Sequence, residues 1–295
     1  MKTIPLFFTP SMVADSGSYS PSAAKPRQVV ASWKTLGIPL TVLEPEPASV
    51  EELSLAHDPG FVRGVLSGAL ENGFGNRSAA VAASLPWTSG AMRSAARHAW
   101  KHGGVAVAPC SGFHHASWAQ VSGFCTFNGL MVTAASLRAQ GARRVGILDC
   151  DHHWGDGTDE IIDHLDASDW VTHFTAGRHY SRPGHTEAFF AKLPEVLGSM
   201  SDCDVVLYQA GADPHLDDPL GGWLTTAQLA ERDRRVFEGL ASLGVPVAWN
   251  LAGGYQREAD GSIPKVLEIH DNTLRACARV HGVVEPGTGA VVSCA

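Results

Sequence analysis

The feature that most constrains this chain is an apolar run at residues 145–148 that gives way abruptly to carboxylates, imidazoles and glycines. Such a run predicts a short buried strand. Because side chains alternate between the two faces of a strand, Asp149, Asp151 and His153 would point the same way if the extended conformation continued past Leu148. Open α/β sheets bind ligands at the carboxyl ends of their strands. We therefore expect this stretch to deliver polar side chains to a metal or substrate site.

Three further apolar runs also end in reactive side chains. They are residues 105–108, followed by His114 and His115, residues 205–209, followed by Asp213, and residues 245–249, followed by Tyr255. If the strands are parallel, all four sets of side chains lie at one edge of the sheet. The convergence of these side chains predicts a functional site, whereas no single motif among them is sufficient.

The rest of the chain alternates between short apolar runs and segments with helical spacing. The remaining predicted elements are strands at 4–8, 41–43 and 170–172, and helices at 29–36, 49–56, 91–100, 130–140, 160–165, 226–243 and 264–280. Repeated strand-then-helix units predict an α/β fold with a central, mostly parallel sheet and helices on both faces. We expect a single domain over residues 1–295, with a loose tail over about 281–295.

Composition narrows the function classes. With 44% hydrophobic and 18% charged residues, the chain of 295 residues can bury a sizeable core. Its net charge of -8, with no run of Lys or Arg, argues against nucleic acid or a membrane as a partner. The beginning of the chain lacks the pattern of a signal peptide. Six scattered cysteines, without Cys-x-x-Cys pairs, argue against zinc fingers and disulfide frameworks. We expect a cytoplasmic location.

The strand ends carry donors that suit a metal ion. Zinc commonly binds imidazole nitrogen and carboxylate oxygen, and a catalytic zinc keeps a position open for water. Asp151, His153 and Asp213 would supply three such ligands from two strands. An isolated Asp-x-Asp-x-His run is as well explained by a solvated or capping cluster. The addition of Asp213 and a histidine pair favours the metal interpretation.

The tandem histidines suit proton transfer near neutral pH, provided that a partner orients each ring. Asp149 and Asp156 are the candidate partners of His114 and His115. A structural alternative remains open, in which one histidine is buried and the other is exposed. Tyr255 follows two glycines at a strand end, so its hydroxyl could donate to a developing oxyanion. No nucleophilic-serine, phosphate-binding or dinucleotide motif is present.

From about His57 to Tyr255, the order and spacing of these residues resemble the histone deacetylase superfamily. The resemblance rests on residues 111–116, 122–128, 147–158, 209–213, 218–222 and 253–255. It implies the arginase/deacetylase α/β fold and zinc-dependent hydrolysis of an N-acyl amide, with one zinc ion per chain and iron as the alternative metal. By position it implies Asp151, His153 and Asp213 as zinc ligands, His114 and His115 as the catalytic pair with His115 as general base, Asp149 and Asp156 as their partners, and Tyr255 as the group that polarises the carbonyl.

The resemblance also implies a substrate channel and a structural potassium ion. The channel residues would be Gly123, Phe124, Leu220 and, from a segment at 178–185 that departs from the family pattern, Tyr180. The potassium residues would be Asp149, Asp151, His153, Thr172 and His173. Trp154 stands where many members have a second histidine, which leaves the ligand intact but changes its surroundings.

Several alternatives remain open. The acylated amine could be a protein lysine, a polyamine or a small metabolite amide, and neither the acyl length nor the formation of a homo-oligomer follows from the sequence. A binuclear manganese ureohydrolase shares the sheet architecture, but it would need more carboxylates than the strand at Asp213 offers. A non-catalytic acyl-lysine-binding module would need neither the histidine pair nor Tyr255.

Overall fold

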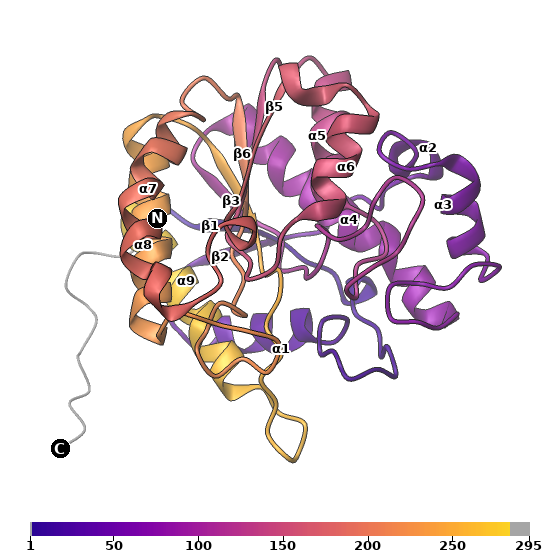
Figure 1. The fold of residues 1–295 in the computed structure, drawn as a ribbon, viewed down its shortest axis with the longest axis horizontal. Coiled ribbons are helices and arrows are strands. Elements are labelled where there is room, and N and C mark those ends of the chain that lie inside the picture. Colours follow the sequence, from indigo (N-terminus) through magenta and orange to yellow (C-terminus); the bar gives the residue numbers. More distant parts are fainter. Residues whose placement is uncertain (1, 284–295) are drawn as a thin grey trace.

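The computed structural model describes residues 2–283 (Figure 1). Its seven described strands form one sheet in the order β2-β1-β3-β7-β6-β4-β5, and every neighbouring pair is parallel. The strands are β1 (Ile4–Phe7), β2 (Leu40–Leu43), β3 (Val105–Val107), β4 (Val145–Asp149), β5 (Val171–Thr175), β6 (Val205–Gln209) and β7 (Val247–Asn250). The parallel α/β sheet predicted from the sequence is confirmed.

The helices cover both faces of the sheet. They are α1 (Lys25–Trp33), α2 (Val50–Leu53), α3 (Pro59–Leu66), α4 (Ala79–His102), α5 (Gly129–Ala139), α6 (Asp156–His164), α7 (Thr186–Gly198), α8 (Thr226–Ser242) and α9 (Pro264–Val280), with short 3-10 turns between some of them. Helices α7, α8 and α9 lie together on one side in Figure 1, and α4, α5 and α6 lie on the other.

Two helices have no counterpart in the sequence prediction, and α4 begins at Ala79, well before the predicted start at residue 91. No helix was predicted directly after residue 56, yet Pro59 begins α3 and the Asp58 side chain caps it by accepting from the Phe61 amide at 2.8 Å. Proline is well tolerated at the first helical position, because an N–H group there would have no acceptor within the helix. Helix α7 was not predicted; it contains Pro194.

Two apolar cores result from the alternation of side chains along the central strands. Tyr208 of β6 and Trp249 of β7 face the core beneath α1, α7, α8 and α9. Leu207 and Ala248, their neighbours in sequence, face the core beneath α2 to α6. Because the central strands are buried on both faces, they read as continuous apolar runs rather than as alternating ones.

The carboxyl ends of the central strands set the place of the site. Asp149 at the end of β4 pairs in register with Gln209 at the end of β6, which in turn pairs with Asn250 at the end of β7. Of the loose tail predicted at 281–295, residues 281–283 follow α9 as a turn, and the remainder lies outside the described residues. Within residues 2–283, no helix is long and apolar enough to cross a membrane.

Candidate active site

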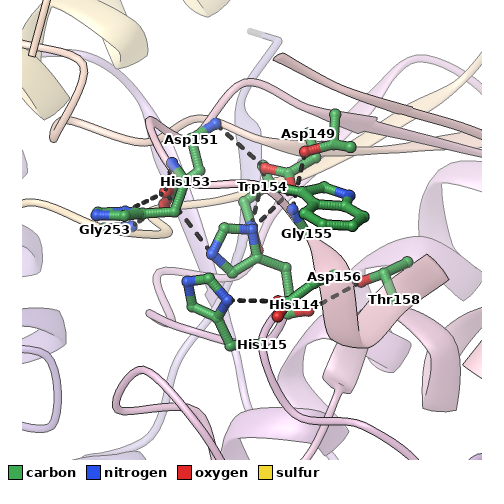
Figure 2. Close-up of polar contacts among 12 residues, drawn as sticks. His114, His115, Asp149, Asp151, His153, Trp154, Gly155, Asp156, Thr158 and Gly253 are labelled. Atoms are coloured by element: carbon green, nitrogen blue, oxygen red, sulfur yellow. Dashed lines mark hydrogen bonds and ion pairs between the residues drawn. The ribbon is translucent and has the colours of Figure 1, made fainter. Parts of the chain in front are cut away.

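The loop after β4 gathers the polar side chains predicted from the sequence (Figure 2). The strand ends at Asp149, so the condition for Asp149, Asp151 and His153 to alternate along an extended chain is not met. The side chains converge by local hydrogen bonds instead: the Asp151 amide donates to Asp149 Oδ1 at 3.1 Å, and the His153 amide donates to Asp151 Oδ1 at 3.0 Å. Each carboxylate thus fixes the backbone two residues further along.

Asp151, His153 and Asp213 form one compact cluster. Their possible ligand atoms all lie within 4.8 Å of one another. Nδ1 of His153 is 3.1 Å from Asp151 Oδ1 and 3.0 Å from Asp213 Oδ2. The remaining carboxylate oxygens are held by backbone donors, since the Gly253 amide donates to Asp151 Oδ2 at 2.8 Å and the His152 amide to Asp213 Oδ1 at 3.2 Å.

Glycine is required beside this cluster. A Cβ atom on Gly253 would lie 2.2 Å from Asp213 Oδ2 and 2.8 Å from Asp151 Oδ2. Any other residue there would push the backbone away from both carboxylates and break the Gly253 amide bond to Asp151. The glycine pair at the end of β7 therefore closes the cluster from one side.

The electrostatics of the cluster fit a bound cation. Burial and the neighbouring Asp151 carboxylate raise the pKa of Asp213 to about 7. Burial lowers the pKa of His153, yet hydrogen bonds and charges from Asp151 and Asp213 raise it to about 11. Two buried carboxylates therefore compete for one positive charge. One imidazole nitrogen and two carboxylate oxygens are donors that zinc and iron accept, so the residues present fit a divalent metal ion.

Each of the two histidines lies against its own carboxylate. His114 Nδ1 donates to Asp149 Oδ2 at 2.7 Å, and His115 Nδ1 donates to Asp156 Oδ1 at 2.6 Å. The two rings are 4.2 Å apart between centroids, and His114 Nε2 lies 3.7 Å from Asp151 Oδ1. With Nδ1 engaged by a carboxylate, Nε2 of each ring is the nitrogen that can exchange a proton with a reactant.

Tyr255 faces the same cluster. Its ring centroid is 6.4 Å from that of His153 and 5.7 Å from that of Phe124, and its amide donates to Asp218 Oδ2 at 2.8 Å. Burial and the Asp213 carboxylate hold the pKa of the Tyr255 phenol well above its usual value. The hydroxyl therefore stays protonated and can donate a hydrogen bond.

Of the predicted channel residues, Gly123 lies against His115 and Phe124 lies beside Tyr255, whereas Tyr180 packs elsewhere. A Cβ on Gly123 would lie 2.3 Å from His115 Cδ2, so only glycine lets this loop cover the His115 ring. Phe124 lies between the rings of Phe74 and Tyr255, and Leu220 is exposed. Tyr180 instead joins an aromatic cluster with Phe189 and Trp223.

The predicted potassium residues are not all brought together. Thr172 pairs with Gly146 in the register of β4 and β5, and its Oγ1 accepts from Arg144 at 3.1 Å. His173 donates to Asp159 at 2.7 Å. The β5 residue beside Asp149 is Thr175, three residues further along than Thr172. The difference arises because β5 is longer than its prediction and ends at Thr175.

Three residues near the cluster were not predicted as functional. Gln209 Nε2 donates to Asp149 Oδ1 at 3.0 Å, and Asp218 anchors the Tyr255 backbone. Lys25 is fully buried and donates to the Ala252 carbonyl at 2.6 Å, and burial lowers its pKa to about 8. Gln209 and Asp218 stand inside recognisable sequence motifs. Lys25 follows a loop rich in Ser and Pro, and nothing in its sequence surroundings signals burial.

Comparison with known proteins identifies the family of this chain. The histone deacetylase domain model matches residues 22–180. The chain is 29% identical over 265 residues to an uncharacterised protein of a Picosynechococcus species, covering 79% of this chain and 84% of that one. It is 28% identical over 191 residues to acetylpolyamine amidohydrolase 1 of Pseudomonas aeruginosa, covering 55% of this chain and 54% of that one.

Among solved structures, the HD domain of HDA15 superposes with a TM-score of 0.75 at 20% identity, covering 98% of this chain and 92% of that one. At this identity the likeness shows a shared fold, and that fold covers nearly the whole chain. The family model itself spans more than half of the sequence. The chain therefore belongs to the histone deacetylase domain family.

Proposed function

We propose that this protein is a zinc-dependent hydrolase that removes an acyl group, such as acetyl, from an acylated amine. One observation carries the proposal: the Asp151–His153–Asp213 cluster, two histidine–carboxylate pairs and the Tyr255 ring meet at one edge of the sheet. Membership of the histone deacetylase domain family and similarity to an acetylpolyamine amidohydrolase support the same chemistry.

The chemistry divides among these residues. A divalent cation held by Asp151, His153 and Asp213 would polarise the amide carbonyl and acidify a water molecule. His115, whose pKa is lowered by burial and by neighbouring His114, is neutral near pH 7 and takes the water proton. Tyr255 donates to the oxygen that becomes negative when the water adds to the carbonyl.

His114 has a different role in this scheme. Although burial lowers its pKa, the Asp149 and Asp151 carboxylates raise it to about 9. His114 therefore carries a proton near pH 7, stabilises negative charge beside the carbonyl carbon, and keeps His115 neutral. The proton taken up by His115 then passes to the departing amine, which leaves with a carboxylate as the other product.

Several observations bear on the alternatives. Among residues 2–283, the one cluster with at least three metal donors is Asp151–His153–Asp213, which supports one transition metal per chain over a binuclear manganese site. The two histidine–carboxylate pairs support catalysis over binding alone. An acetylated polyamine or small amide remains the alternative to an acetyl-lysine substrate. The five described cysteines are buried and unpaired, which supports work in a reducing compartment such as the cytoplasm.

Acetate release tests the proposal. The zinc-loaded protein would be assayed on an acetyl-lysine peptide and on an acetylated diamine, with Tyr255→Phe alongside and Tyr180→Phe as a matched control outside the cluster. We expect Tyr255→Phe to lower kcat by roughly 10²–10³-fold, as for loss of one oxyanion donor. Turnover of this variant near the wild-type rate would remove Tyr255 from the mechanism. No turnover on a broad acyl panel, with zinc bound, would favour the binding module.

A further inference from the structure

The core beneath α8 contains a charged pair that the proposed chemistry does not use. Arg232 and Asp233 are both fully buried, although their helix carries several other charged residues that face solvent. A buried guanidinium is costly unless its donors and its charge are matched. The neighbours of Arg232 therefore indicate what holds it there.

Two of the bonds made by Arg232 reach the backbone that carries the metal ligands. Nη1 donates to the Cys150 carbonyl at 3.1 Å and to the Gly211 carbonyl at 2.7 Å. Cys150 directly precedes Asp151, and Gly211 lies two residues before Asp213. A single nitrogen thus links the two loops that present the carboxylates of the cluster.

The position of these carbonyls explains why a side chain is needed. The register of β4 and β6 ends at the pair Asp149 and Gln209, and the Cys150 amide makes the last cross-strand bond, to the Gln209 carbonyl at 3.0 Å. Beyond that bond the two strands no longer pair with each other, although the Ala212 amide after β6 still donates to the Gly253 carbonyl at 2.9 Å. Arg232 supplies the donor that the sheet no longer provides.

Asp233 fixes the guanidinium in place. Arg232 Nε donates to Asp233 Oδ1 at 2.8 Å, the Tyr208 hydroxyl donates to the same oxygen, and Thr273 Oγ1 donates to Oδ2 at 2.6 Å. The pair has no net charge, so its action on the site is through geometry rather than through field. Side chains from β6, α8 and α9 together orient one planar donor group.

We propose that Arg232 is a positioning residue for the metal site, which holds the Cys150 and Gly211 backbone so that Asp151 and Asp213 stay at the spacing a single cation requires. The inference rests on the proposed metal-dependent function. The two carboxylates repel each other when no cation is bound, and the loops that carry them no longer pair with each other. A shared donor behind both loops opposes their separation and so favours metal binding.

Metal affinity tests this role without any assay of activity. Zinc binding by Arg232→Lys would be measured by competition with a chromophoric chelator, and the visible absorption spectrum of the Co²⁺-loaded protein would report ligand geometry. Lysine keeps the charge beside Asp233 but cannot place nitrogens at both the Nε and Nη1 positions. We expect zinc affinity to fall by roughly 10–100-fold, the usual range for groups that orient metal ligands, and the cobalt spectrum to change.

Arg235→Lys is the matched control. Arg235 lies on the same helix and also donates to a backbone carbonyl, that of Phe190 on α7, at 3.4 Å. Its replacement should leave zinc affinity and the cobalt spectrum unchanged. If Arg232→Lys does not fold, Thr273→Val removes one bond to Asp233 and should produce a smaller change in the same two measurements.

The outcomes separate the two proposals. Wild-type zinc affinity and an unchanged cobalt spectrum in a folded Arg232→Lys or Thr273→Val variant would overturn the positioning role. Absence of zinc binding at Asp151, His153 and Asp213 in the wild-type protein would instead overturn the proposed function. Weaker binding in both Arg232→Lys and Arg235→Lys would assign the effect to general loosening of α8 and also overturn the positioning role.

Discussion

The two histidine–carboxylate pairs have nearly the same hydrogen-bond length and very different surroundings. The His114–Asp149 pair is buried, and Asp149 also accepts from Gln209 and from the Asp151 amide. The His115–Asp156 pair lies nearer to solvent, and the Asp156 side chain is half exposed. The ring centroids of the two histidines are only 4.2 Å apart. The same pair of residue types therefore has two different environments within one site.

The difference sets opposite pKa shifts. Burial opposes charge on both rings, but Asp149 and Asp151 together overcome it at His114, whereas neighbouring His114 adds to it at His115. The lesson is that the partner carboxylate alone does not define the role of a histidine. The number of buried carboxylates around each ring decides which one keeps its proton.

The largest expected effect is on turnover. His115→Ala should lower kcat by roughly 10²–10⁴-fold, the range for loss of a general base, and leave zinc content unchanged. His114→Ala should cost less, because its ring is assigned an electrostatic role. Steady-state kinetics of both variants, with metal content measured on each, checks the assignment. A larger loss in His114→Ala would assign the general base to His114 and the electrostatic role to His115.

The next effect is on stability. Asp149→Asn should lower the free energy of unfolding of the metal-free protein by about 3 kcal/mol, because the buried His114 ring loses the carboxylate that offsets the desolvation of its charged form. Asp156→Asn should change it by less than about 1 kcal/mol, since that pair is partly solvated. Urea denaturation measures both. Equal losses in the two variants would contradict the contrast in burial.

His57 is a buried histidine without a carboxylate partner, so it tests how burial alone changes the pKa of an imidazole. Its Nδ1 donates to the Ser117 carbonyl at 2.9 Å and its Nε2 accepts from the Asn128 amide at 2.8 Å, so the ring must stay neutral. Burial lowers its pKa to about 4. The unfolded chain therefore binds a proton that the folded one excludes, and stability falls as pH drops from about 6.5 to 4, by up to about 3 kcal/mol.

That pH dependence can be measured by urea unfolding at several pH values. His57→Asn, which removes the titrating ring, should be less stable at pH 7 but show a shallower decline below pH 6.5. The same decline in both proteins would assign the acid sensitivity to other groups. It would also weaken the argument that carboxylates, rather than burial, keep His114 charged.

The smallest expected effect is a shift in a pH profile. The rise of kcat/KM with pH reports the general base of the free enzyme. Asp156 raises the pKa of His115 against the lowering influence of burial and His114. In Asp156→Asn the acidic limb should therefore move to lower pH, with a lower plateau because the base is weaker. A shift to higher pH, or no shift, would show that the acidic limb does not report the ionisation of His115.

The centre of the sheet was predictable because β3, β4, β6 and β7 are short, largely apolar runs followed by polar residues or glycine. The cluster at the strand ends followed from the same observation, since parallel strands must end at one edge. The roles of its residues stay predictions. Helix α3 was missed because a proline in the sequence can mark either the end of one helix or the start of the next. Pro59 begins a helix.

Two further differences between the sequence prediction and the structure have physical causes. In the run from Glu231 to Arg235, every residue is charged, and the pattern does not tell which two enter the core. Only the tertiary position of the Cys150 and Gly211 carbonyls distinguishes Arg232 from its neighbours. Likewise, residue 180 is aromatic, but the unpredicted helix α7 determines that it packs on Phe189 rather than beside Phe124.

The tryptophan at the rim of the site provides an optical signal. Trp154 is 43% exposed, donates to Asp159 at 2.7 Å and lies beneath the Arg178 guanidinium, whereas Trp33, Trp223 and Trp249 are buried. It directly follows His153, so a ligand that orders the loop after β4 changes the solvent and the charges around this indole. Comparison of fluorescence from the wild-type protein and Trp154→Phe therefore isolates an intrinsic reporter of site occupancy, which needs no attached dye and no turnover.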